Sequence, residues 1–479
     1  MTIVIIGAGF SGTLTAVHLL RSPGAAGRRV LLVNRSGAMA RGVAYGTRSE
    51  QLVLNVPAGR MSAFDDDPDS FIRFVRGRGL SIEGGAFVRR DLYGDYLEWL
   101  LRNAADRVPE GAFDWLISEV ARIDLLQDGN GAWVTLTDGQ RLHADRIVLA
   151  IGNYPPQPPD VPGAEAFWTS RRYVADPWRP DAFADIDPDQ PMICLGTGLT
   201  MIDVVLERRR GGMRGDATAI SRRGLLPMAH RSPALPADRV ELPTGLIEGT
   251  AATARGYCRA VRRHVRDAAA RDVDWRDVMA TLRPITAALW QALPIDERRR
   301  WLRHLRPFWD VHRHRLAPEL ADLFSRLRQE GHVRVAAARL VGVRDEPHGV
   351  VVSVRPRGTD EIRELTAGCV VNCTGPAGDT RRLNDPLFKS LCAQGLLQPD
   401  PLGLGIEISS DGIALGRDGA PVRAIYYVGP FLRARDWEAT AVPELRQYAK
   451  QVADHLLASI DRRPPSSAIG ETLTTTNTP

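Results

Sequence analysis

The hydrophobic positions near the N-terminus form two short runs on either side of an amphipathic segment. Residues 3–6 are an unbroken β-branched run, which is typical of a central parallel strand covered on both faces. The amphipathic segment extends to Leu20, and a second apolar run spans residues 30–33. This order predicts a strand, a helix and a second strand that belong to one parallel sheet.

A glycine-rich turn joins the first predicted strand to the helix, with Gly7, Gly9 and Gly12 at the spacing of a dinucleotide-binding loop. Such glycines permit the tight turn, the close approach of backbone to pyrophosphate and the packing of helix on strand. The first turn of the helix then directs free N–H groups at the phosphates. We therefore expect a bound dinucleotide here, with Phe10 and Ser11 as further contacts.

The end of the second strand departs from the usual pattern. Asn34 stands where an Asp or Glu usually binds the adenine ribose. An amide can still form a hydrogen bond with a hydroxyl, so we expect Asn34 and the adjacent Arg35 at the cofactor, with a weaker ribose contact.

A second glycine loop follows the apolar run at residues 192–195 and precedes a helix and a strand at 217–220. Met201 takes the place of the third glycine, so the helix should stand slightly further from the strand. The pattern predicts a second nucleotide site. The residues expected to bind this nucleotide are Gly196, Gly198 and Thr200.

Two arginines, Arg222 and Arg223, come directly after the strand at 217–220. A 2′-phosphate lies at this place in NADP-binding units, and guanidinium groups suit phosphate. The pair favours NADPH over NADH, although two surface arginines that end a strand are the alternative. NADPH at the second loop leaves FAD for the first.

The layout is partly duplicated. Residues 115–152 and 333–375 each predict a small antiparallel meander that closes in an apolar strand, a small residue and a glycine. We predict an α/β fold of two interleaved Rossmann-like dinucleotide-binding domains with an additional helical insert. The expected segments are 1–155 (FAD domain, first part), 156–245 (NADPH domain), 246–332 (helical insert), 333–461 (return to the FAD domain) and 462–479 (disordered tail).

The predicted helical insert is rich in arginine and carries four tryptophans, which we expect to pack it onto the rest of the protein. Arg313, His314 and Arg315 lie together near its end and could face an anionic substrate. His314 is a candidate catalytic residue, with a structural histidine as the alternative.

Composition narrows the classes of protein that remain. The chain has 479 residues, 44% of them hydrophobic, and a net charge of +5. Its arginines are dispersed among acids, which argues against nucleic acid, and no apolar run approaches the roughly 18 residues of a membrane span. The five cysteines contain no C-x-x-C pair, which argues against zinc and a redox disulfide and suits a reducing cytoplasm. We expect no metal, and the oligomeric state stays open, with a homodimer as one option.

The motifs together resemble the bacterial FAD/NAD(P)-binding protein family, which is related to flavin-containing monooxygenases and amino-acid N-hydroxylases. A urate hydroxylase is among the proteins that look similar. The resemblance covers nearly the whole chain. It rests on the two glycine loops and on the segments 41–46, 54–57, 61–64, 372–376 and 442–446. Beyond the first loop, the resemblance and the strand-end glycines place the flavin at Arg90, Gly152, Thr374, Gly375, Gly429 and Pro430.

The resemblance also implies a catalytic role for Asn55. Flavin-containing monooxygenases carry an asparagine in a similar stretch beside the flavin, although a turn residue before Pro57 is the alternative. A helix that starts near Val442 is expected to direct its N-terminus at the flavin carbonyl.

We therefore expect an FAD-dependent, NADPH-consuming monooxygenase that hydroxylates a small soluble substrate with molecular oxygen, through a flavin C4a-hydroperoxide. The His-Ser pair that precedes the second glycine loop in monooxygenases is missing, and residues 173–178 stand there instead. An FAD/NAD(P)H dehydrogenase or reductase without oxygenation, or a non-catalytic flavin-binding regulatory protein, therefore stays open as an alternative.

Overall fold

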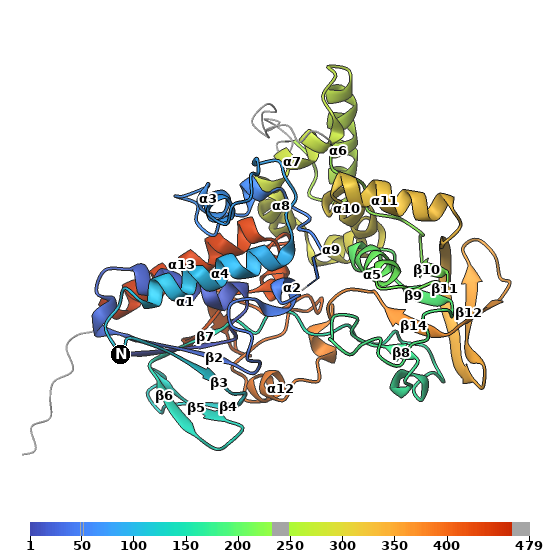
Figure 1. The fold of residues 1–479 in the computed structure, drawn as a ribbon. Coiled ribbons are helices and arrows are strands. Elements are labelled where there is room, and N and C mark those ends of the chain that lie inside the picture. The colour runs from blue at the N-terminus through green and yellow to red at the C-terminus, as the bar shows by residue number, and fades with distance from the viewer. Residues whose placement is uncertain (48, 51, 232–248, 462–479) are drawn as a thin grey trace, which may run out of the picture.

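The computed structural model describes residues 1–47, 49–50, 52–231 and 249–461. Two sheets lie side by side, each flanked by helices, and a group of helices rises above the junction between them (Figure 1). The predicted disordered tail at 462–479 lies outside the described residues.

The first sheet has the strand order β15-β16-β7-β1-β2-β3, and all its pairs are parallel except β15 with β16. Consecutive side chains of β1 enter two different cores, as the period of two of a strand requires. Ile3 and Ile5 face one core, and Val4 and Ile6 face the other. The strands are β1 (Thr2–Ile6), β2 (Arg29–Asn34), β3 (Phe113–Ile117), β7 (Arg146–Leu149), β15 (Ile413–Leu415) and β16 (Pro421–Tyr427).

Helices cover one face of this sheet, whereas a meander and one helix cover the other. The first face carries α1 (Phe10–Arg21), α4 (Arg90–Ala105) and α13 (Val442–Asp461), with α2 (Gly42–Tyr45) and α3 (Ser70–Gly77) beside them. The second carries β4 (Val120–Leu125), β5 (Ala132–Leu136), β6 (Arg141–Ala144) and α12 (Pro386–Ala393).

The second sheet has the order β13-β12-β11-β10-β9-β14-β8. Helices α5 and α11 pack on one face over a core that includes Met201 and Phe324. The members are β8 (Tyr173–Val174), β9 (Met192–Leu195), α5 (Leu199–Arg210), β10 (Ala217–Ser221), α11 (Pro318–Gln329), β11 (Val333–Glu346), β12 (Gly349–Pro356), β13 (Arg363–Ala367) and β14 (Cys369–Asn372).

The predicted return to the first domain at residue 333 is wrong. β11 pairs in parallel with β10, and β14 pairs in parallel with β9, so residues 333–372 belong to the second sheet. The boundary was misplaced because each domain contains its own antiparallel meander, so the second meander continues the second domain. The chain therefore rejoins the first domain only after Asn372, and α11 belongs with the second sheet as the crossover between β10 and β11.

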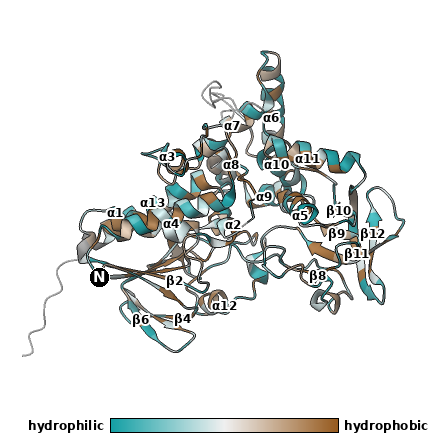
Figure 2. Cartoon of the chain, in the orientation of Figure 1, coloured by the Kyte–Doolittle hydropathy of each residue, from teal (hydrophilic) through white to brown (hydrophobic). Residues whose placement is uncertain are grey.

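The helical insert consists of short helices whose apolar faces meet one another and the segment around Trp437. Hydrophobic residues are concentrated on the central strands, whereas the projecting helix α6 is mostly hydrophilic (Figure 2). The insert contains α6 (Ala254–Ala269), α7 (Trp275–Thr281), α8 (Thr286–Ala292), α9 (Ile295–His304) and α10 (Arg306–Arg313). Single 3₁₀ turns lie at Ala25–Gly27, Ala58–Arg60, Phe167–Thr169, Arg283–Ile285, Thr380–Arg382 and Pro430–Ala434.

Candidate nucleotide sites and the seam between them

The first glycine loop lies where β1 and β7 end side by side, which is the edge at which doubly wound sheets bind nucleotides. Gly7 has a φ of +105°, and a Cβ on it would lie 2.3 Å from the carbonyl oxygen of Ala150. A Cβ on Gly12 would lie 1.9 Å from the carbonyl oxygen of Gly7. Both positions therefore require glycine for the fold itself.

Gly9 differs from the other two glycines because a side chain has room there. Its φ is −80°, and an added Cβ would meet only the Cα of Gly42, at 3.7 Å. Helix α1 starts directly after Gly9 without a side-chain cap, so its first N–H groups stay available to an anionic ligand. This open, uncapped helix start fits a pyrophosphate group.

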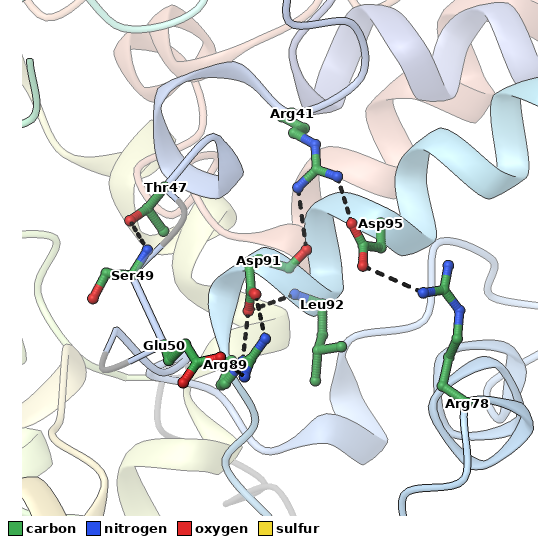
Figure 3. Close-up of polar contacts among 9 residues, drawn as sticks. All are labelled: Arg41, Thr47, Ser49, Glu50, Arg78, Arg89, Asp91, Leu92 and Asp95. Atoms are coloured by element: carbon green, nitrogen blue, oxygen red, sulfur yellow. Dashed lines mark hydrogen bonds and ion pairs between the residues drawn. The ribbon is translucent and has the colours of Figure 1, made fainter. Parts of the chain in front are cut away.

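A network of ion pairs holds the segment after Ala40 against helix α4 (Figure 3). Arg41 binds Asp95 and the carbonyl oxygen of Asp91. Arg89 binds both Asp91, at 2.5 Å, and Glu50, at 3.0 Å. These contacts fix the turn that carries Gly42 beside the glycine loop.

The end of β2 is occupied by contacts within its own loop. The amide group of Asn34 donates to the carbonyl oxygens of Ser36, at 2.6 Å, and Ala38, at 3.2 Å. A ribose hydroxyl could therefore donate only to the amide oxygen of Asn34. Arg35 is exposed and lies 3.7 Å from Glu119.

The second glycine loop repeats this geometry where β9 and β14 end. Gly196 has a φ of +112°, and a Cβ there would lie 2.4 Å from the carbonyl oxygen of Cys373. Gly198 begins α5 without a side-chain cap and has open space around it, and Thr200 lies in the first turn. Met201, at the third-glycine position, is fully buried in the core beneath.

The two arginines after β10 lie in different surroundings. Arg223 donates to the carbonyl oxygen of Arg303 at 3.2 Å and lies over the ring of Phe308. Arg222 is exposed, and no contact holds its guanidinium within the described part of the chain. Arg222 is therefore the freer of the two for a phosphate group.

Polar contacts join the domains at the seam between the loops, and one of them runs from the hydroxyl of Ser49 to Glu207 of α5 at 2.5 Å. The guanidinium of Arg90 donates to Asp203 of α5 at 2.7 Å and to the carbonyl oxygen of Val53 at 2.9 Å. The His230 ring lies 3.0 Å from the carbonyl oxygen of Asn55. Burial raises the pKa of Asp203, and the Arg90 charge opposes that rise.

Positive charge surrounds His230. Burial, followed by the charge of Arg315, lowers the pKa of His230 to about 4, so its ring is neutral near pH 7. Arg315 is 9% exposed, and burial and the neighbouring arginines lower its pKa to about 10. The Asn55 carbonyl therefore accepts a hydrogen bond from a neutral imidazole, while the Asn55 side chain makes no hydrogen bond with the described residues.

The sequence singled out His314, but His230 is the histidine at Asn55. The backbone N–H of His314 donates to the carbonyl oxygen of Asp310 at the end of α10. His230 and Asp203 had no motif around them, because each gains its partner from a segment more than 100 residues away. The one sequence signal was the arginine cluster on both sides of His314.

The late flavin candidates lie at the ends of strands. Gly152 and Gly375 have φ values of +67° and +86°, and Thr374 donates to the side-chain oxygen of Asn372 at 2.7 Å. Gly429 has a φ of +149°, and Pro430 after it is buried. The first turn of α13 bears Glu444, which is bound by Arg283, so an acid already lies at that helix start.

No helix among the described residues is long and apolar enough to cross a membrane. Within the same residues, no group of three or more His, Cys, Asp or Glu side chains could hold a metal ion.

Comparison with known proteins supports the first site and the fold. Residues 4–154 match a family model described as FAD-NAD(P)-binding. No curated protein matches the sequence.

Three solved structures each cover 96% of this chain. Ornithine hydroxylase from Pseudomonas aeruginosa is 18% identical, with a TM-score of 0.63 and 99% of its own chain covered. L-lysine 6-monooxygenase from Pseudomonas syringae is 16% identical, with a TM-score of 0.66 and 99% covered. Ornithine N-hydroxylase from Kutzneria is 17% identical, with a TM-score of 0.63 and 98% covered. The predicted resemblance is confirmed: the chain has the two-domain fold of the N-hydroxylating flavin monooxygenases, and its first domain matches the FAD-NAD(P)-binding family model.

Proposed function

We propose that this protein is an FAD-dependent monooxygenase that consumes NADPH and hydroxylates an organic substrate. The observation that carries the proposal is the pair of uncapped glycine loops, after β1 and after β9, at the strand ends of two domains joined at one seam. The match of residues 4–154 to the FAD-NAD(P)-binding family model supports FAD at the first loop. The similar structure from Kutzneria, which contains reduced FAD, NADP⁺ and L-ornithine, supports the pairing of the two cofactors.

The net reaction consumes one substrate C–H or N–H bond, O₂, NADPH and a proton, and yields the hydroxylated product, water and NADP⁺. FAD, when bound, supplies the centre that takes the hydride and reacts with oxygen. The protein binds and orients the partners. The Gly7–Gly12 loop receives one pyrophosphate, the Gly196–Gly198 loop receives the other, and Arg222 is placed for a 2′-phosphate.

Two side chains at the seam serve the oxygen step in this proposal. Asn55 offers an amide that no protein group engages within the described residues, and His230 fixes its backbone. A neutral His230 adds no positive charge of its own to the arginines around it. Asn55 and His230 are partly buried, and a site that limits access of water protects a reactive intermediate from decay.

Rapid mixing of the purified protein tests the proposal. The protein should be yellow, NADPH should bleach it without oxygen, and oxygen should then give the transient absorbance of a flavin C4a-hydroperoxide. Direct return to oxidised flavin would favour a dehydrogenase or reductase. Failure of both nicotinamides to reduce the flavin would favour a regulatory protein.

A further inference from the structure

The helical insert lines a cavity of about 810 Å³ that is partly open to solvent, and its volume is within the usual size range of small-molecule sites. Its wall comes from all five helices α6 to α10, from Met228 after β10 and from Trp437 of the first domain. Because the cavity is partly open, a small molecule has a route into it.

The wall is apolar and aromatic. Trp290 and Trp309 lie on it, and both direct their indole N–H groups away to protein acceptors, the carbonyl oxygen of Ala434 at 2.9 Å and Glu438 at 2.7 Å. Neither indole N–H is therefore free at the cavity, which keeps this part of the wall apolar. Trp437 follows the turn at Pro430–Ala434 and precedes α13, so one wall belongs to the segment that the sequence assigns to the flavin.

Charge at the cavity has one sign. Arg262 and Arg266 lie four residues apart on α6, both line the cavity and both are exposed. Like charges at this spacing repel each other. Neither guanidinium makes a hydrogen bond or ion pair with another described residue. The described residues that line the cavity include no Asp or Glu.

We propose that this cavity binds an amphipathic carboxylic acid, with its apolar body among the tryptophans and its carboxylate at Arg262 and Arg266. The similar solved structures are named for ornithine and lysine, whose amino groups need acidic partners that this wall lacks. The identification of this ligand as the substrate rests on the proposed function. Its binding to the cavity does not depend on that function.

Equilibrium binding to the full chain tests the inference, with intrinsic tryptophan fluorescence as the signal and probes kept below their micelle concentrations. Dodecanoate, dodecanol and dodecylamine share one chain length and differ in the head group. Dodecanoate should bind tightest and dodecylamine weakest. Equal binding of dodecanoate and dodecylamine would overturn the assignment of the carboxylate.

Variants separate the two halves of the site. Arg262→Ala with Arg266→Ala should weaken dodecanoate about fivefold and leave dodecanol unchanged, since both side chains are exposed. Arg263→Ala with Arg271→Ala removes the same charge from side chains outside the cavity and should change neither. If both pairs of substitutions weaken dodecanoate binding equally, the effect comes from net charge alone, and the assignment of the carboxylate to Arg262 and Arg266 is overturned.

Leu289→Trp fills the cavity and should weaken dodecanoate and dodecanol at least tenfold. Val265→Phe provides a second filling variant, and thermal melting identifies a variant that fails to fold. Unchanged binding to both folded variants would show that the ligand lies elsewhere. If dodecanoate binds but NADPH does not reduce the flavin, the binding site is supported and the proposed monooxygenase activity is contradicted. The two proposals can therefore fail separately.

Discussion

Arg90 and Asp203 form a buried ion pair that ties the first domain to the second. Their side chains meet at 2.7 Å, and that of Asp203 is only 5% exposed. Arg90 lies at the first position of α4 and also holds the carbonyl oxygen of Val53, two residues before Asn55. The pair thus sets the position of α5, which starts at the second glycine loop, relative to the loop that carries Asn55.

Removal of Arg90 alone should lower the free energy of unfolding more than removal of Arg90 and Asp203 together. Arg90→Ala leaves a buried carboxylate without its partner and should lower the free energy of unfolding by about 3 kcal/mol. Arg90→Leu with Asp203→Leu removes both charges and should cost clearly less. Urea unfolding of the wild type, Arg90→Leu, Asp203→Leu and the Leu double variant completes a double-mutant cycle and measures the coupling between the two side chains. Additive losses would mean that the pair does not couple the domains.

Glycines in the same loop should fail for different reasons. Gly12→Ala places a Cβ 1.9 Å from the carbonyl oxygen of Gly7, so it should lower the free energy of unfolding of the flavin-free protein by about 3 kcal/mol. Gly9→Ala has room in the protein and should melt like the wild type when flavin-free. It should nevertheless lose most of its bound FAD, because the added methyl meets the pyrophosphate. Melting temperature and flavin absorbance report the two effects, and full flavin content in Gly9→Ala would remove that loop from the site.

The nicotinamide preference should depend more on Arg222 than on Arg223. Arg222→Ala should raise the KM for NADPH about tenfold and leave the KM for NADH unchanged, because only NADPH carries the 2′-phosphate. Arg223→Ala should have a smaller effect, since its guanidinium is already held at Arg303. Steady-state flavin reduction with each nicotinamide checks this. Equal changes for both nicotinamides would place the 2′-phosphate elsewhere.

Local sequence was sufficient for the glycine loops. The positive φ of Gly7 and the close approach of Gly12 follow from a strand that turns directly into a helix, and both are visible within twelve residues. The repeated meanders were equally readable, since alternation and turn residues are local. The parallel pairing of β10 with β11 was not, because the strands are separated by the helical insert, and the domain boundary at 333 was therefore wrong.

The seam shows the same limit more sharply. Asn55 could be singled out by resemblance, but its neighbour His230 is 175 residues away. No periodicity or motif links the two positions, and only the assembled sheets bring them together. The cavity of the helical insert was missed for a related reason: tryptophans at helical spacing predict a packed core, and whether five short helices leave space between them depends on their angles.

Two partly buried histidines should make the protein less stable below neutral pH. Burial lowers the pKa of both His18 and His230 from 6.5 to about 4. The unfolded chain therefore binds protons more readily than the native state between these values, so stability is complete above about pH 6.5 and falls as the pH drops toward 4. Each histidine should lower the free energy of unfolding by about 2 kcal/mol when the pH falls from 7.5 to 5.

Variants isolate this effect from the carboxylates that titrate in the same range. The glutamine in His230→Gln does not titrate and can still donate to the Asn55 carbonyl. The free energy of unfolding of this variant should therefore fall by about 2 kcal/mol less than that of the wild type between pH 7.5 and pH 5. His304→Gln, a change at the end of α9, serves as the matched control and should follow the wild type. Urea unfolding at the two pH values gives both differences. A pH dependence in His230→Gln equal to that of the wild type would mean that folding does not lower the pKa of His230, and the effect of burial on this ring would have to be abandoned.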